Sequence, residues 1–121
     1  MDIIIGGLST FWHHARAEPV ADGGIVPEIL IAVSALPGAM VWRHNTGSGK
    51  LHGRQWIEFG CPGSGDIIGC YRGRAIAIEC KSPTGRQSTP QKRFQAAWEL
   101  AGGVYIVARS VEDAVEGLKN V

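Results

Sequence analysis

Three residues that could act together chemically, Asp66, Glu79 and Lys81, stand in an otherwise apolar part of the sequence. If the two carboxylates are neighbours, they repel each other, and removal from water adds to the cost. A divalent cation such as Mg²⁺ or Mn²⁺ offsets that cost, because these ions prefer hard oxygen ligands. With a phosphate nearby, the cation would activate a water and Lys81 would stabilise the pentacovalent phosphate or orient the water. The alternative is a buried ion cluster with a structural role only.

A predicted β-hairpin would bring these residues together. The apolar stretches on either side of Arg72-Gly73 read as two strands joined by a two-residue turn, in which the glycine can supply a positive φ. Paired residue numbers in such a hairpin sum to 145, which places Asp66 opposite Glu79. Lys81 follows Glu79 by two residues and therefore points to the same face of its strand.

Composition predicts one ordinary domain. The chain has 121 residues and a formal net charge of +1, which argues against a strongly adhesive nucleic-acid binder. We expect residues 25–121 to form the domain and assign no structure to residues 1–24, where His13 and His14 read as structural or surface residues. No apolar run approaches the ~20 residues of a membrane span, so we expect a cytoplasmic protein without membrane contacts. The three cysteines make no disulfide framework and no zinc pair, and we expect them to be buried: Cys61, Cys70 and Cys80.

Basic residues flank the acidic pair on both sides. Residues 72–93 contain six Lys or Arg against Glu79 alone, and residues 41–54 contain three with no acid. Such stretches suit a phosphate backbone, although solvated loop charges explain any single one equally well. The candidate backbone contacts are Arg43, Asn45, Lys50 and Arg86.

A helix is predicted over residues 25–36, with its start at Pro27 and its end before Pro37-Gly38. Its apolar stripe consists of Ile29, Leu30, Val33 and Leu36. Glu28 lies in the first turn, where a carboxylate favours the helix dipole. A third acid reaching the metal is the other interpretation of Glu28, and both stay open.

The remaining elements complete a mixed sheet. Strands are predicted at residues 39–45, 55–59 and 104–108, the last fully apolar and central, with a glycine-rich turn at 45–50. Helices are predicted from the Ser88 cap to Ala101, with Phe94, Ala97, Trp98 and Ala101 as the buried stripe, and over Val111–Lys119. Gln91 fits a capping box with Ser88, or could orient the attacking water or Lys81. The predicted order is α-β-β-β-β-α-β-α, a mixed α/β sheet with helices on both faces.

This order, with Asp66, then Glu79-Cys80-Lys81 and a glutamine in the following helix, resembles the PD-(D/E)XK nuclease superfamily and its restriction-endonuclease-like fold. More narrowly it is similar to the VRR-Nuc (virus-type replication-repair nuclease) family, in the small stand-alone form found in phages. The matching segments lie within roughly residues 27–110 and are Trp42–Gly47, Gly60–Gly69, Ile78–Arg86, Gln91 and Gly102–Val104.

The resemblance implies Mg²⁺- or Mn²⁺-dependent hydrolysis of phosphodiester bonds in DNA. It makes Asp66 and Glu79 metal ligands together with the carbonyl of Cys80, Lys81 the catalytic lysine and Gln91 the active-site glutamine, while Glu28 corresponds to an acid of the family's first helix. It also implies branched substrates of replication or repair, such as four-way junctions, whose two symmetric cuts favour a homodimer. A non-catalytic DNA-binding module on the same fold and a restriction-type duplex endonuclease are the alternatives.

Overall fold

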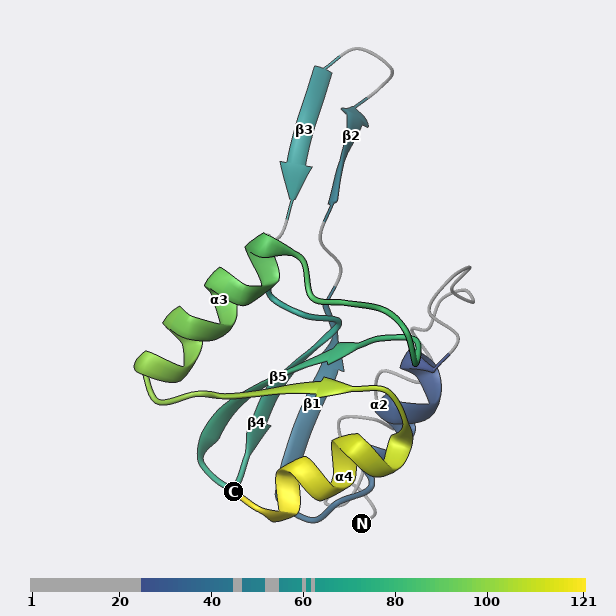
Figure 1. Cartoon of the computed structure of the whole chain (residues 1–121), viewed down its shortest axis with the longest axis vertical. Coiled ribbons are helices and arrows are strands. Elements are labelled where there is room, and N and C mark those ends of the chain that lie inside the picture. Colours follow the sequence, from purple (N-terminus) through teal and green to yellow (C-terminus); the bar gives the residue numbers. More distant parts are fainter. Residues whose placement is uncertain (1–24, 45–46, 52–54, 60, 62) are drawn as a thin grey trace.

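The computed structural model describes residues 25–44, 47–51, 55–59, 61 and 63–121 (Figure 1). The interpretations of residues 1–24 and Asn45 therefore lie outside the described residues. The elements, in chain order, are α2 (Val26–Ser34), β1 (Ala39–Arg43), β2 (Gly47–Leu51), β3 (Gln55–Phe59), β4 (Ile67–Tyr71), β5 (Arg74–Cys80), α3 (Thr89–Leu100), β6 (Val104–Ala108) and α4 (Val111–Lys119).

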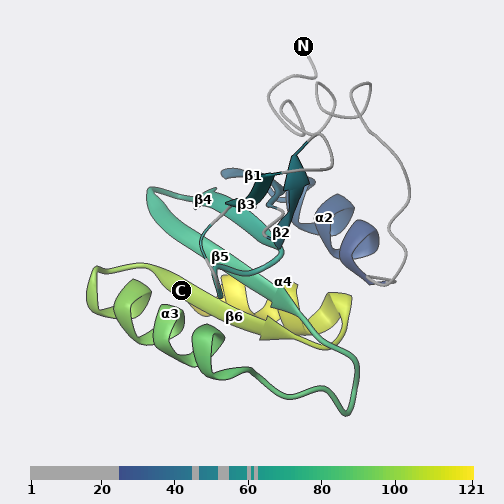
Figure 2. The same ribbon diagram turned by 90° about the horizontal axis from the view of Figure 1, so that it is seen from above.

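Four strands form one mixed sheet in the order β1-β4-β5-β6. β1 and β4 are antiparallel, as are β4 and β5, whereas β5 and β6 run parallel and are connected through α3. The prediction of a mixed α/β sheet with helices on both faces is confirmed: α3 lies on one side, and α2 and α4 lie on the other (Figure 2). The prediction that residues 104–108 form a central strand is wrong. In the sheet that the described residues form, β6 is an edge strand, and α3 and α4 pack on its two faces, which explains its apolar sequence.

The central hairpin has the predicted register. Ile67 pairs with Ile78 and Tyr71 with Arg74, so the residue numbers of each pair sum to 145. Arg72 and Gly73 both have positive φ, 49° and 85°, as a two-residue type I′ turn requires. This turn matches the right-handed twist of the flanking strands, and it fixes which residues of β4 and β5 share a face.

The predicted strand over residues 55–59 is confirmed as β3, and one further strand, β2, replaces a predicted turn. Residues 45–50 were expected to be a glycine-rich turn, but residues 47–51 form β2, which pairs antiparallel with β3 in a separate two-stranded sheet. This hairpin extends away from the four-stranded sheet (Figure 1). The chain passes from β1 to β4 through this hairpin. Gly47 and Gly49 lie within β2, so the presence of glycines did not mark a turn here.

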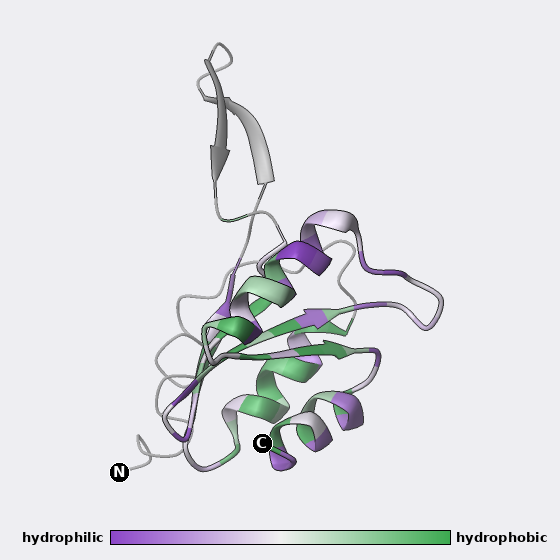
Figure 3. Cartoon of the chain, turned by 60° about the vertical axis from the view of Figure 1, so that its left-hand side comes forward, coloured by the Kyte–Doolittle hydropathy of each residue, from purple (hydrophilic) through white to green (hydrophobic). Residues whose placement is uncertain are grey.

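The hydrophobic core lies between the sheet and the pair α2 and α4. Apolar side chains of all four strands line this face. Figure 3 shows green, hydrophobic stretches along the strands of this sheet. The predicted stripe of α2 is confirmed, because Ile29 and Val33 are fully buried and Leu30 and Leu36 pack against the core. Ser110 caps α4 by accepting a hydrogen bond from the backbone of Asp113.

The opposite face is covered only by α3. Phe94 and Trp98 stack on each other and lie partly buried, but Ala97 and Ala101 are exposed, so the predicted four-residue stripe is half wrong. None of the residues of α3 is fully buried. Because α3 covers mainly β6, the β1 and β4 side of this face stays open in the described part of the chain.

Cys70 lies on this open region, beside the half-exposed Met40. Cys61 is also exposed, so the expectation of buried cysteines is wrong for these two, and only Cys80 is partly buried. All three are free thiols. Within the described segments, no helix combines the length and apolar character needed to cross a membrane.

Candidate active site

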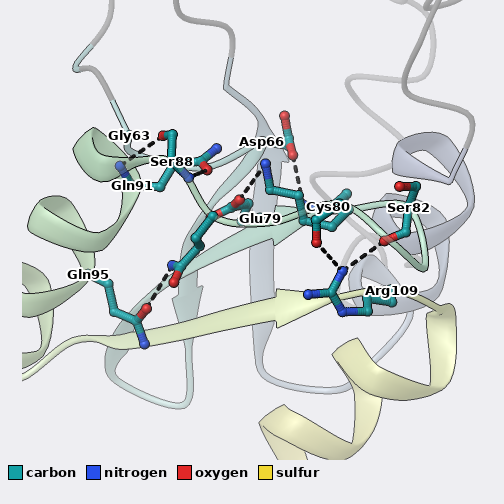
Figure 4. Close-up of polar contacts among 12 residues, drawn as sticks. Gly63, Asp66, Glu79, Cys80, Ser82, Ser88, Gln91, Gln95 and Arg109 are labelled. Atoms are coloured by element: carbon teal, nitrogen blue, oxygen red, sulfur yellow. Dashed lines mark hydrogen bonds and ion pairs between the residues drawn. The ribbon is translucent and has the colours of Figure 1, made fainter.

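Glu79 is a buried carboxylate at the end of β5. Its side chain is 1 % exposed, although strand alternation turns it away from the hydrophobic core and toward the side of α3. Oε1 accepts a hydrogen bond of 2.6 Å from the Tyr105 hydroxyl, and Lys81 Nζ lies 3.0 Å from Oε2 (Figure 4). The Lys81 contact is an ion pair without hydrogen-bond geometry, so Oε2 accepts no hydrogen bond from the described residues. A buried carboxylate oxygen in this state is poised for a further ligand.

Asp66 comes directly before β4 and bends toward the end of β5. Its backbone N–H donates to the carbonyl of Ile78 at 2.8 Å, and its Oδ2 accepts the N–H of Cys80 at 2.7 Å. The prediction that Asp66 pairs directly opposite Glu79 is wrong, because the regular ladder ends at the Ile67–Ile78 pair. The side chain of Asp66 instead continues the hydrogen bonding of the hairpin and stays close to the Glu79 carboxylate.

The proximity of the two acids is visible in the pKa of Asp66. Burial raises this pKa above its ordinary value, and the negative charge of Glu79 raises it further. The Cys80 N–H and the positive charges of Arg43 and Lys81 act in the opposite direction without cancelling the rise. The site therefore holds Asp66 where its ionised form is disfavoured, as expected for a metal ligand without its cation.

Tyr105 supports Glu79 from the neighbouring strand β6. Burial raises the pKa of its phenol, and the hydrogen bond to Glu79 raises it further, so the hydroxyl keeps its proton and acts as a donor. The carbonyl of Gly63 lies 3.1 Å from the same hydroxyl. Tyr105 thus fixes Oε1 of Glu79 and connects it to the loop that precedes Asp66.

That loop packs tightly on the start of α3. A Cβ atom on Gly63 would lie 2.3 Å from the carbonyl oxygen of Pro90, and the residue has φ +83°, so both sterics and backbone conformation require glycine. Ser88 caps α3 by accepting from the backbone of Gln91, and Gln91 Oε1 accepts the N–H of Ser88 in return. The predicted capping box is confirmed, and it places α3 beside the Asp66 loop.

The residues present fit a hard divalent cation. Oε2 of Glu79, which is ion-paired with Lys81, and the nearby Asp66 carboxylate supply two anionic oxygens, and Mg²⁺ commonly takes one or two carboxylates and completes its shell with water. The described residues contain no group of three or more His, Cys, Asp or Glu side chains arranged for a metal. Glu28 is exposed in the first turn of α2 and does not form such a group with Asp66 and Glu79. Burial raises the pKa of the Cys80 thiol to about 12 and the charge of Asp66 adds to the rise, so this thiol is protonated at neutral pH in the metal-free protein.

The other predicted site residues have different positions. Arg43, at the end of β1, is close enough to Asp66 to lower the pKa of that carboxyl, and Arg86 is exposed in the loop after β5. Lys50 belongs to β2, but its side chain lies outside the described part, as does Asn45. Gln91 uses Oε1 for the cap, which leaves its amide nitrogen as the atom that could act on a ligand.

Two residues at this end of the sheet were missed from the sequence. The strand over residues 104–108 was predicted to be fully apolar, although it contains Tyr105. A buried tyrosine hydroxyl usually has a hydrogen-bond partner, and this was the one signal of a polar contact in the strand. Arg109 follows β6 and its Nη1 donates to the carbonyls of Ser82 and Gly85 at 2.8 and 2.7 Å (Figure 4). No local pattern predicts those contacts, which connect segments 24 to 27 residues apart.

No known protein-family model matches the chain, and no curated protein matches it either.

Proposed function

We propose that the chain is a divalent-metal-dependent endonuclease that hydrolyses phosphodiester bonds, with branched DNA of replication or repair as its substrate. The observation that carries this proposal is the buried Oε2 of Glu79, which has an ion pair with Lys81 but accepts no hydrogen bond. Glu79 Oε2, the Asp66 carboxylate and the carbonyl of Cys80 would hold Mg²⁺ or Mn²⁺. When bound, the cation would supply Lewis acidity for water activation and for the charge on the phosphate.

The protein residues have separate tasks in this proposal. Tyr105 holds Oε1 of Glu79, so that Oε2 remains the oxygen directed at the ligand site. Lys81, with 20 % of its side chain exposed, places an ammonium beside the carboxylates and within reach of solvent. There it would stabilise the negative charge that develops on the phosphate during in-line attack by water. The amide nitrogen of Gln91 would orient that water or Lys81 from the start of α3.

The substrate part of the proposal rests on charge and symmetry. Arg43 places positive charge near Asp66, and the exposed Arg86 adds positive charge in the loop after β5, as binding to a DNA backbone requires. Two symmetric cuts in a four-way junction need two sites, so we propose that the chain acts as a homodimer.

Cleavage of a four-way junction and of a linear duplex of the same sequence tests the proposal. With Mg²⁺ or Mn²⁺ the wild type should cut the junction, and EDTA should stop it. Lys81→Met should lower kcat about 10²–10³-fold, because one charge-stabilising donor is removed. Asp66→Asn should lose activity at least as strongly, and Lys119→Met on the exposed end of α4 is the matched control. Full activity of Asp66→Asn or Lys81→Met, with folding confirmed by circular dichroism, would refute the site, and equal cleavage of the duplex would refute branch selectivity.

A non-catalytic DNA-binding module is the rival. The ion pair of Lys81 with Glu79 favours it, because the lysine already neutralises the buried carboxylate without a cation. Junction binding without cutting under both Mg²⁺ and Mn²⁺ would support this rival.

A further inference from the structure

An open hollow of about 410 Å³ lies next to the carboxylates, and we call it the basic hollow. Its lining residues are Arg86, Gln87, Lys92, Val107 and Arg109. Val107 on β6 is the direct neighbour of Glu79 on β5, and adjacent strands lie about 4.8 Å apart. The basic hollow is therefore one strand removed from Glu79, beside the proposed site.

Three of the five lining side chains are cationic. The Lys81–Glu79 contact is the salt bridge found in the described part of the chain, and it involves none of the three. The nearby acid Asp113 accepts the backbone N–H of Arg109 at 2.9 Å, not its guanidinium. None of the three cations is thus ion-paired in the described part of the chain, which leaves each of them available to an anion.

Arg109 is held in place before any ligand arrives. Its Nη1 donates to two backbone carbonyls of the loop after β5, which fix the guanidinium without cancelling its charge. A guanidinium has five N–H donors, so donors remain for an oxygen anion. Phosphate fits this arrangement well, because a fixed guanidinium binds it bidentately and a lysine adds a point charge.

Gln87 connects the basic hollow to the acidic pair. Its side chain lies at the Tyr105 hydroxyl, where its hydrogen bond lowers the pKa of the phenol in part. It also donates to Gln95 Oε1 at 2.8 Å. Tyr105 in turn donates to Glu79. A nucleic-acid strand with one phosphate at Glu79 would therefore pass the polar edge of Gln87 and meet the three cations.

We propose that the basic hollow binds a phosphate group that flanks the scissile phosphate on the same DNA strand. The proposal rests on the proposed function, since it takes the scissile phosphate to lie at Asp66 and Glu79. It assigns to Lys92 and Arg109 a role in substrate binding, and it places the predicted backbone contact Arg86 at this flanking phosphate.

The test compares two double variants that each remove two positive charges. Arg86→Gln/Lys92→Gln alters the basic hollow, and Arg93→Gln/Lys119→Gln alters exposed cations that do not line it. Anisotropy with a labelled junction in EDTA gives Kd at several salt concentrations. The slope of log K against log salt should fall in magnitude by about 1 for each lost phosphate contact in the hollow variant, and stay unchanged in the control. Equal slopes in the two variants would overturn the proposal.

Two further measurements separate this proposal from the proposed function. In cleavage assays the hollow variant should raise KM with kcat kept within about 3-fold, because a flanking contact binds substrate and transition state alike. In the metal-free wild type, titration with inorganic phosphate should shift the backbone amide resonances of Gln87, Lys92 and Arg109 saturably, and Arg86→Gln/Lys92→Gln should abolish those shifts. If the protein never cuts DNA but the hollow variant still shows the reduced salt slope, the nuclease is refuted and the basic hollow remains a binding site for a DNA phosphate, without a scissile phosphate beside it. If the wild type binds inorganic phosphate saturably but the hollow variant has unchanged DNA affinity, the flanking-phosphate proposal is overturned in favour of a site for free phosphate.

Discussion

The two faces of the four-stranded sheet differ in what they bury and in how thickly they are covered. Against α2 and α4, the sheet buries a continuous set of aliphatic side chains, among them Ile67, Ile76 and Ile78 at 0 % exposure. Against α3, the sheet buries the carboxylate of Glu79 together with Ala77 and Tyr105, and α3 itself has no fully buried residue. Ile78 and Glu79 are neighbours in β5, so the alternation of a single strand sends one to each face.

This difference separates stability from chemistry. Burial of aliphatic surface on the α2 and α4 face supplies the free energy of folding. The α3 face can then hold two carboxylates, an ammonium and a tyrosine whose arrangement is unfavourable by itself. Substitutions on the two faces should therefore affect different measurements, and the following predictions test that separation from the largest expected effect to the smallest.

Ile78→Ala should have the largest effect on stability. It removes a fully buried side chain between β5 and the α2 and α4 layer, and such a truncation lowers the free energy of unfolding by about 2–5 kcal/mol. Ile31→Ala on the exposed side of α2, where the side chain is 68 % exposed, should cost no more than about 0.5 kcal/mol. Urea unfolding followed by circular dichroism measures both. Similar values for the two variants would mean that the core is not where the structure places it.

Tyr105→Phe should destabilise the metal-free protein by about 1–3 kcal/mol, because Oε1 of the buried Glu79 loses its donor. The ring remains, so packing against Phe94 is preserved and the change isolates the hydrogen bond. Tyr71→Phe on the core face is the control, since the described residues make no hydrogen bond to its hydroxyl. Equal unfolding midpoints for Tyr105→Phe and the wild type would show that Glu79 does not depend on this donor.

The two helix caps allow a direct comparison of the faces. Ser88→Ala removes the cap of α3 and Ser110→Ala that of α4, and each change should cost about 1 kcal/mol of helix stability. Because α3 buries no residue completely, we expect the Ser88→Ala cost to appear mainly as faster amide hydrogen exchange within α3. The Ser110→Ala cost should appear in global unfolding, since Leu118 and Ala114 anchor α4 in the core. A global loss from Ser88→Ala as large as that from Ser110→Ala would contradict this division.

Asp66→Asn should slightly stabilise the metal-free protein at neutral pH. Burial raises the pKa of Asp66 above its unfolded value, so the folded protein binds the proton more tightly than the unfolded chain does. Stability of the wild type therefore falls as pH rises from the unfolded pKa near 3.9 through the higher folded pKa, and the asparagine variant lacks this loss. The effect is the smallest of the four, because the Cys80 N–H, Arg43 and Lys81 offset part of the rise.

Thermal melts from pH 3.5 to 8 measure this difference. In the wild type, added Mg²⁺ or Mn²⁺ should recover the lost stability at neutral pH, whereas the asparagine variant should respond less. If the stability of the wild type, measured relative to Asp66→Asn, rises with pH in this range, the raised pKa of Asp66 is contradicted.

The sequence by itself determined the parts of this protein that depend on local pattern. The two-residue turn at Arg72-Gly73 set the register of β4 and β5, because a one-residue shift would send every apolar side chain to the wrong face. The same register put Glu79 and Lys81 on one face and Asp66 at the same end of the hairpin. The stripe of α2 and the cap of α3 were likewise predictable, since each depends on residues within a few positions of one another.

Only the tertiary structure decided how the site is completed. Tyr105 reaches Glu79 across 26 residues of sequence, and Arg109 reaches Ser82 across 27, because the parallel pairing of β5 and β6 brings their ends together. The edge position of β6, the extra strand β2 and the exposure of Ala97 and Cys70 also depend on which neighbours cover each surface. Periodicity and turn chemistry predict the two faces of an element. The packing of distant segments determines which face is covered, and with it the burial of the Glu79 carboxylate.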